Sequence, residues 1–131
     1  MPAGGTVFRR DLSRSLNVSL VAYWKLEETS GTRVDSAGAN DLTDVNTVTQ
    51  NPGRVGNAAQ FTLANSECLT IADNAALSMA NIDFTLAAWV YLDSNPADSM
   101  RIICKGDTGN AANFEYGLRW INSTDRFQFQ I

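Results

Sequence analysis

Histidine is absent from the 131-residue chain. Without an imidazole, the chain cannot form a Ser/His/Asp or Cys/His nucleophile pair, a histidine metal ligand or a histidine pH switch. Long apolar runs are also missing, and nothing approaches the roughly 18–20 consecutive apolar residues that span a bilayer. We therefore expect a chain that is not an enzyme and does not insert into a membrane.

Basic residues are scarce as well. Ten Lys and Arg stand against fourteen Asp and Glu, which gives a net charge of -4 and a pI near 4.6. Such a surface repels a phosphate backbone, so we expect no nucleic-acid partner. Near the N-terminus, Val7 and Phe8 are followed at once by Arg9 and Arg10, so no signal peptide is visible. We interpret residues 1–18 as a poorly ordered leader or linker.

Cysteine occurs only as Cys68 and Cys104, 36 residues apart. Two cysteines outside a CxxC motif are too few for a zinc site. A disulfide needs Cα atoms within about 7 Å of each other, which the sequence cannot establish. We favour two buried free thiols over a disulfide.

What the chain has instead is an alternation of turn formers and short apolar segments, which is typical of an all-β protein. Asp73 or Asn74 is a candidate N-cap for one short helical turn. The apolar segments, spaced at about 8–12 residues with turn signals between them, predict a β-sandwich or barrel. The predicted strands are residues 19–26, 42–43, 45–49, 59–63, 67–71, 84–92, 100–105, 114–120 and 126–131, of which 84–92 is the strongest.

Several short motifs are weak evidence for a protein family when taken singly, but their order and spacing along the chain are more specific. They are Trp24 before an acidic-Thr-Ser-Gly turn, Asp35-Ser36-x-Gly38, Gly56-Asn57-Ala58, Ala88-Trp89-Val90 and Lys105-Gly106-Asp107. From residue 19 to 131 the chain resembles the laminin-G-like, concanavalin-A-like jelly-roll family. The resemblance implies an antiparallel two-sheet β-sandwich, a jelly roll, of which 19–131 is the N-terminal part. In this sandwich Trp24 and Trp89 pack between the sheets, and the unpaired strand edges of the incomplete domain favour self-association. It also implies an extracellular, cell-surface or virion-associated protein.

Oxygen ligands gather in one loop, at Asp35, Ser36, Asn40 and Asp41. Calcium takes about six to eight oxygens from such side chains and from backbone carbonyls, and laminin-G-like domains often hold Ca²⁺ near a loop rim. The alternative is an Asx-turn that hydrogen-bonds its own backbone. These four residues are therefore candidate calcium ligands, with the Asx-turn as the favoured alternative.

Aromatic residues on segment 114–120 offer a candidate ligand-binding face. Phe114, Tyr116 and Trp120 share one side of a strand because their spacing is even. Flat rings stack on sugar faces, so this side is a binding surface if it is concave and open to solvent; otherwise the rings belong to the core.

The adjacent pair Glu27-Glu28 does not indicate glycoside hydrolysis, because neighbouring side chains on an extended segment point to opposite faces. The sequence therefore favours a non-catalytic carbohydrate- or protein-binding adhesion module. The alternatives are a purely structural β-sandwich of a virion or cell-surface protein, and an accessory domain of a secreted glycoside hydrolase.

Overall fold

The computed structural model describes residues 19–93, 97–106 and 113–131. The expected leader at 1–18 lies outside these residues. Within the described ranges every regular element is a β-strand or a short 3₁₀ turn, so the all-β class is confirmed. The strands form small antiparallel sheets that are separate from one another, and a closed two-sheet sandwich is not seen.

Two small sheets lie in the N-terminal half. Strand β1 (Thr43–Val45) pairs with β4 (Cys68–Thr70), and β2 (Thr49–Pro52) pairs with β3 (Asn57–Gln60). The turn between β2 and β3 contains Gly53-Arg54-Val55-Gly56, where the Gly53 N–H donates to the Gly56 carbonyl over 2.8 Å. The 3₁₀ turn η1 (Leu63–Asn65) then leads into β4.

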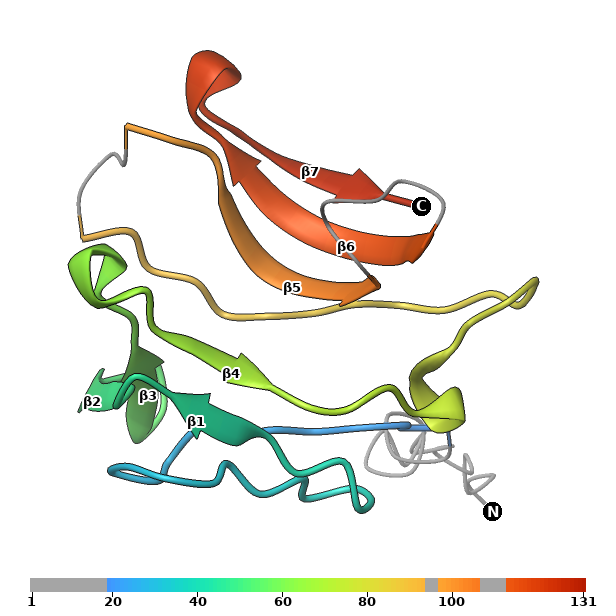
Figure 1. The fold of residues 1–131 in the computed structure, drawn as a ribbon, viewed down its shortest axis with the longest axis horizontal. Helices are drawn as coiled ribbons and strands as arrows, with labels where there is room; N and C mark the ends of the chain where they lie inside the picture. Colours follow the sequence, from blue (N-terminus) through green and yellow to red (C-terminus); the bar gives the residue numbers. More distant parts are fainter. Residues whose placement is uncertain (1–18, 94–96, 107–112) are drawn as a thin grey trace, which may run out of the picture.

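The C-terminal half is one three-stranded sheet of order β5-β6-β7 (Figure 1). These strands are β5 (Met100–Gly106), β6 (Phe114–Ile121) and β7 (Arg126–Gln130), and the 3₁₀ turn η4 (Asn122–Thr124) joins the last two. Asp125 follows η4 with a φ of 52°, a left-handed conformation that Asp tolerates in tight turns. This sheet confirms the three strands predicted at 100–105, 114–120 and 126–131.

The predicted first strand, 19–26, is wrong as a regular strand. Only Trp24 forms a bridge, to Asp35, and Arg33 forms a second one to Leu42. The Asp35 carboxylate takes the place of a strand partner at one backbone amide here, where it accepts from the Tyr23 N–H over 2.8 Å. Side chains of the loop therefore compete with the sheet for the backbone of this segment.

The strongest predicted strand, 84–92, also has no ladder in the structure. Figure 1 draws it as a long extended run between β4 and β5, but no strand is assigned there. Trp89 is 85 % exposed, so its predicted place between two sheets is wrong. Trp24 is half-buried and donates its indole N–H to the Asn40 carbonyl over 2.6 Å. High strand propensity does not form a strand without a partner in register, because sheet pairing is a tertiary interaction.

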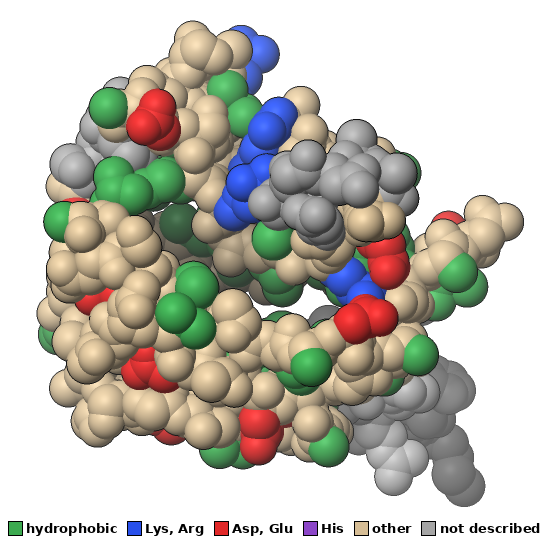
Figure 2. All heavy atoms as spheres, viewed as in Figure 1, with side chains coloured by type: hydrophobic (Ala, Val, Ile, Leu, Met, Phe, Trp, Pro, Cys, Tyr) green, Lys and Arg blue, Asp and Glu red, His purple; other side chains and the backbone are tan. Residues whose placement is uncertain are grey.

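Buried side chains form two separate groups. Val48 and Arg33 are fully buried in the N-terminal half, and Tyr116 and Trp120 are buried on β6. Figure 2 shows hydrophobic side chains scattered over the visible face and a hollow between the two halves. Cys68 and Cys104 are free, as predicted, but both are exposed rather than buried.

Candidate functional site: a cleft beside β6

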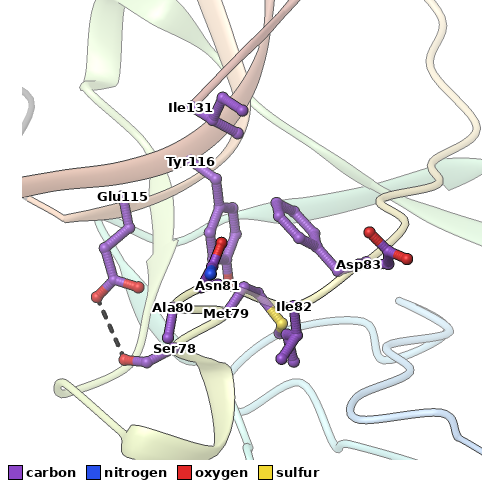
Figure 3. A pocket seen from close by; sticks show the side chains of 10 residues that line it. Ser78, Met79, Ala80, Asn81, Ile82, Asp83, Glu115, Tyr116 and Ile131 are labelled. Carbon is purple, nitrogen blue, oxygen red and sulfur yellow. Dashed lines mark hydrogen bonds between the residues drawn. The ribbon is translucent and has the colours of Figure 1, made fainter.

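A cleft of about 460 Å³ lies between segment 78–84 and strand β6. Figure 3 shows Tyr116, Glu115 and Ile131 on one side and the turn from Ser78 to Asp83 on the other. We call this site the cleft. Its lining residues are Ser78, Met79, Ala80, Asn81, Ile82, Asp83, Phe84, Glu115, Tyr116 and Ile131.

The wall of the cleft, from Ser78 on, directly follows the 3₁₀ turn η2 (Ala75–Leu77), which Asn74 caps. The Asn74 side chain accepts from Ala76 N–H over 2.9 Å, as predicted for an N-cap at 73 or 74. After η2 the chain turns again, with Ile82 N–H donating to the Met79 carbonyl over 3.0 Å. Ala80 in this turn has a φ of 37°. Side chains from 78 to 83 therefore project from a sharply curved backbone rather than from a strand.

Tyr116 fixes this wall to the sheet. Its hydroxyl donates to the Leu77 carbonyl over 2.7 Å, and burial raises the pKa of the phenol above its ordinary value of 10.0. The ring centroid of Phe84 lies 5.1 Å from that of Tyr116, in a tilted arrangement. Tilted ring pairs at this separation are favourable because the edge of one ring meets the face of the other. The floor of the cleft is thus an aromatic pair in which one part-buried hydrogen bond anchors Tyr116.

A charged network borders the cleft. Lys105 on β5 forms ion pairs with Asp73 and, over 3.3 Å, with Glu115. The hydrogen bond from Lys105 lowers the pKa of Asp73, and the same bond raises the pKa of Lys105. The Glu115 carboxylate also accepts from the Ser78 hydroxyl over 3.2 Å, the contact dashed in Figure 3. Lys105 and Ser78 therefore hold the Glu115 carboxylate at the edge of the cleft.

The segment before the cleft also ties the two halves of the molecule together. Asn74 donates its side-chain amide to the Asn40 side-chain oxygen over 2.7 Å. On the other side, Asp73 and Leu77 contact the three-stranded sheet through Lys105 and Tyr116. The shape of the cleft therefore depends on contacts made by residues 73–77 in both directions.

Of the predicted aromatic binding residues, only Tyr116 lines the cleft. Tyr116 is 5 % exposed and Trp120 is 2 % exposed, while Phe114 is half-buried. The interpretation of this face as a binding surface required it to be open to solvent. Tyr116 and Trp120 instead form core, so the structure does not bring the three rings together as an open platform.

The predicted calcium loop is closed by its own hydrogen bonds. The Asp35 carboxylate accepts from the backbone N–H groups of Tyr23, Ala37 and Asn40 and from the Asn40 side-chain amide, at 2.8–3.1 Å. Burial opposes ionisation of Asp35, but these four donors outweigh it and lower its pKa from 3.8 to about 2. Asp41 accepts from the Asp35 N–H over 2.8 Å. The loop thus has the geometry of the Asx-turn alternative, with N–H donors around the Asp35 carboxylate.

Ser36 lies apart from the Asp35 carboxylate contacts. It lines a second hollow of about 430 Å³ together with Leu20, Tyr23, Lys25 and Ala37. Lys25 places a positive charge beside this hollow, which disfavours a cation there. In the described ranges no group of three or more His, Cys, Asp or Glu side chains is placed to hold a metal ion.

Sequence reasoning missed Ser78, Asn81, Asp83 and Glu115 as cleft residues. Polar residues of a turn and a polar residue on a strand carry no shared spacing that would point to one site. The N-cap signal at Asn74 was the available hint, since it marked a compact turn immediately before this wall.

Comparison with known proteins adds no further identification. No family model matches the chain, and no match was found among curated proteins or solved structures. In the part of the chain that the structure describes, no helix is long and apolar enough to cross a membrane.

Proposed function

We propose that the protein is a non-catalytic carbohydrate-binding module of laminin-G-like type, and that the cleft is its sugar site. The observation that carries this proposal is the half-buried ring of Phe84, packed on the buried Tyr116, with the side chains of Ser78, Asn81 and Glu115 around the same cavity. Sugars present apolar C–H faces and a rim of hydroxyl groups. A ring surface next to amide, hydroxyl and carboxylate groups matches both features.

The polar groups of the cleft have complementary hydrogen-bonding roles. Asn81 offers both a donor and an acceptor, and its side chain is exposed. The Glu115 carboxylate accepts only and is already oriented by Lys105 and Ser78. A preoriented acceptor costs less side-chain entropy on binding, which favours recognition of a ligand hydroxyl.

The family resemblance supports the same proposal, because concanavalin-A-like domains are commonly lectin-like. In this role the protein works outside the cell, on a cell surface or on a virion. A protein ligand is the other partner class that the sequence favours. A structural sandwich without a small ligand and an accessory domain of a glycoside hydrolase remain the alternatives.

Glycan-array screening followed by affinity gel electrophoresis on neutral polysaccharides tests the proposal. We expect at least one glycan to bind, and N81A to weaken binding at least fivefold because a ligand hydroxyl loses its amide partner. N51A is the matched control, since Asn51 is exposed on β2 and does not line the cleft. Folded protein that binds no glycan would favour the purely structural alternative.

A second variant separates loss of the site from loss of the fold. F84L keeps an apolar side chain beside Tyr116 but removes the ring, and F61L makes the same change at an exposed phenylalanine outside the cleft. We expect F84L to weaken glycan binding and F61L to leave it unchanged. Equal binding by both variants would contradict the role of the aromatic floor.

A further inference from the structure

Residues 84–92 are an extended segment with no hydrogen-bonded neighbour. In Figure 1 the segment runs between β4 and β5, and the structure assigns it to no sheet. Within residues 19–93, 97–106 and 113–131, no hydrogen bond is made by its backbone N–H or C=O groups. The segment therefore presents a row of free donors and acceptors, which is the feature that recruits another strand to a sheet edge.

The side chains of this segment alternate as they do in a strand. Trp89 and Tyr91 are 85 % and 86 % exposed, whereas the adjoining Val90 and Leu92 are 40 % and 36 % exposed. Residues of the same parity share one face of an extended chain. The outward face thus carries two neighbouring aromatic rings, and such exposed apolar groups mark interaction surfaces.

The charges at the two ends of the segment determine which kind of strand can pair with it. The segment contains no charged residue, but Asp83 and Asp93 stand immediately before and after it. When two copies pair antiparallel about Ala88, Asp83 of one copy lies opposite Asp93 of the other at both ends. Like charges directly opposite each other are destabilising in a sheet. The two carboxylates therefore oppose pairing with a second copy of the chain and favour basic residues at those positions.

We propose that residues 84–92 bind an extended segment of a partner protein by strand addition, and that this segment carries Lys or Arg at both ends. The backbone ladder supplies affinity, and Trp89 and Tyr91 pack against side chains on one face of the added strand. Asp83 and Asp93 select the partner by forming cross-strand ion pairs with its ends. This surface adjoins the sugar site, because Asp83 and Phe84 also line the cleft. Glycan binding by A88P, which changes neither residue, therefore distinguishes failure of one proposal from failure of the other.

A synthetic peptide of alternating valine and threonine with a lysine at each end is the probe. Fluorescence anisotropy of the labelled peptide measures its binding to the full chain at low ionic strength. We expect the same peptide with glutamate at each end to bind at least tenfold more weakly. In D83K/D93K this preference should reverse, because the flanking charges are exchanged while the strand itself is unchanged.

Proline substitution tests the ladder itself. A88P removes one backbone donor in the middle of the segment and should reduce binding of the lysine-ended peptide at least tenfold. A72P is the matched control at an exposed alanine outside any strand, and it should bind like the unchanged protein. Circular dichroism of both variants confirms that the fold survives.

Two outcomes would overturn the proposal. Equal binding of the lysine-ended and glutamate-ended peptides by the unchanged chain would show that the flanking carboxylates do not select the partner. Dimerisation of the unchanged chain in analytical ultracentrifugation, abolished by A88P and not by A72P, would show that the second strand comes from another copy of this protein.

Discussion

Arg33 and Asp44 both hydrogen-bond to the backbone of the same two residues, Gly31 and Val48. Asp44 accepts from the N–H of Gly31 over 3.2 Å and from the N–H of Val48 over 2.8 Å. Arg33 donates to the carbonyls of both residues, with 2.8 Å to Val48. Arg33 is fully buried, as is Val48. The two side chains thus fasten the 31–48 loop through its peptide groups.

The first prediction concerns the hydrogen bonds that Arg33 and Asp44 make to the 31–48 loop. R33L should lower the free energy of unfolding by about 2–4 kcal/mol, because the buried carbonyl of Val48 and the part-buried carbonyl of Gly31 each lose a charged donor. D44A should cost about 1–2 kcal/mol. The double variant should be less destabilised than the sum by at least about 0.5 kcal/mol, since both residues order the same segment. Urea denaturation of the unchanged protein, the two single variants and the double variant measures these free energies of unfolding. Strict additivity would show that Arg33 and Asp44 stabilise the loop independently of each other.

The second prediction concerns acid stability. The folded pKa of Asp35, about 2, lies below its ordinary value of 3.8. The ionised form is therefore favoured by folding, and its stabilisation is complete above the ordinary pKa and is lost as the pH falls from there toward 2. We expect about 1–2 kcal/mol to disappear over this window.

The D35N variant supplies the comparison for that measurement. It should be less stable than the unchanged protein at pH 7, because an amide group replaces one acceptor that faces N–H donors. Its stability should change less between pH 5 and pH 2 than that of the unchanged protein, which is about the range over which a carboxylate with this shift titrates. Parallel pH profiles for the two proteins would contradict the role of the Asp35 charge.

The third prediction separates two glycines with similar backbone conformations. Gly31 and Gly56 have φ values of 71° and 62°. A methyl group at Gly31 meets nothing within 4 Å, whereas at Gly56 it would overlap the Glu27 carboxylate. That carboxylate accepts from Asn57 N–H over 2.8 Å. G31A should therefore cost about 1–2 kcal/mol from backbone strain alone.

G56A should cost about 1 kcal/mol more than G31A, because Glu27 must move and loses its bond to Asn57. Thermal or urea unfolding of the two variants gives the difference. Adding E27A to each should remove the extra cost at position 56 and leave the cost at position 31 unchanged. An equal cost for G31A and G56A would mean that the Glu27 contact has no energetic weight.

The fourth prediction concerns the floor of the cleft. Y116F removes the hydroxyl that donates to the Leu77 carbonyl and should cost about 1 kcal/mol. Amide exchange in residues 75–79 should accelerate more than exchange in β6, because the lost bond anchors the turn and not the strand. Uniform acceleration across both segments would indicate that the bond supports the whole sheet instead.

The fifth prediction concerns calcium. The four donors around Asp35 occupy the oxygens that a cation would need, so we expect the same melting temperature with and without Ca²⁺. A ligand that binds only the folded state raises the melting temperature in proportion to its occupancy. A rise in melting temperature with Ca²⁺ that is abolished by a chelator and by D41A would contradict this prediction and show that the loop binds calcium.

Some elements were accessible from sequence because their signals are local. The turn formers and even-spaced apolar residues of 114–120 and 126–131 predict strands that the structure contains as β6 and β7. The Asn74 cap needs only the residues immediately after it. Residues 19–26 and 84–92 carry equally strong patterns but form no regular strand. Pairing requires a partner in register, and residue types along one segment do not supply it.

The candidate site depends on contacts between distant residues. The spacing of Phe114, Tyr116 and Trp120 correctly places them on one strand, but the spacing cannot tell an open face from a buried one. Ser78 and Glu115 are 37 residues apart and meet only through the packing of the 73–84 segment on β6. In the same way, the sequence shows only that Asp35 and Asn40 carry oxygens suited to a cation. The structure shows that the Asp35 carboxylate accepts hydrogen bonds from nearby N–H groups.

By itself, the sequence determined that these 131 residues contain no histidine, carry a net charge of -4 and have strand-forming segments separated by polar turns. These are properties of composition and local spacing, and they hold whatever the packing. The tertiary structure alone decided that Tyr116 is a buried anchor, that Asp35 is held ionised by backbone donors and that Trp89 faces solvent. Burial and hydrogen-bond partners arise from segments far apart in the chain, so they appear only when those segments meet in space.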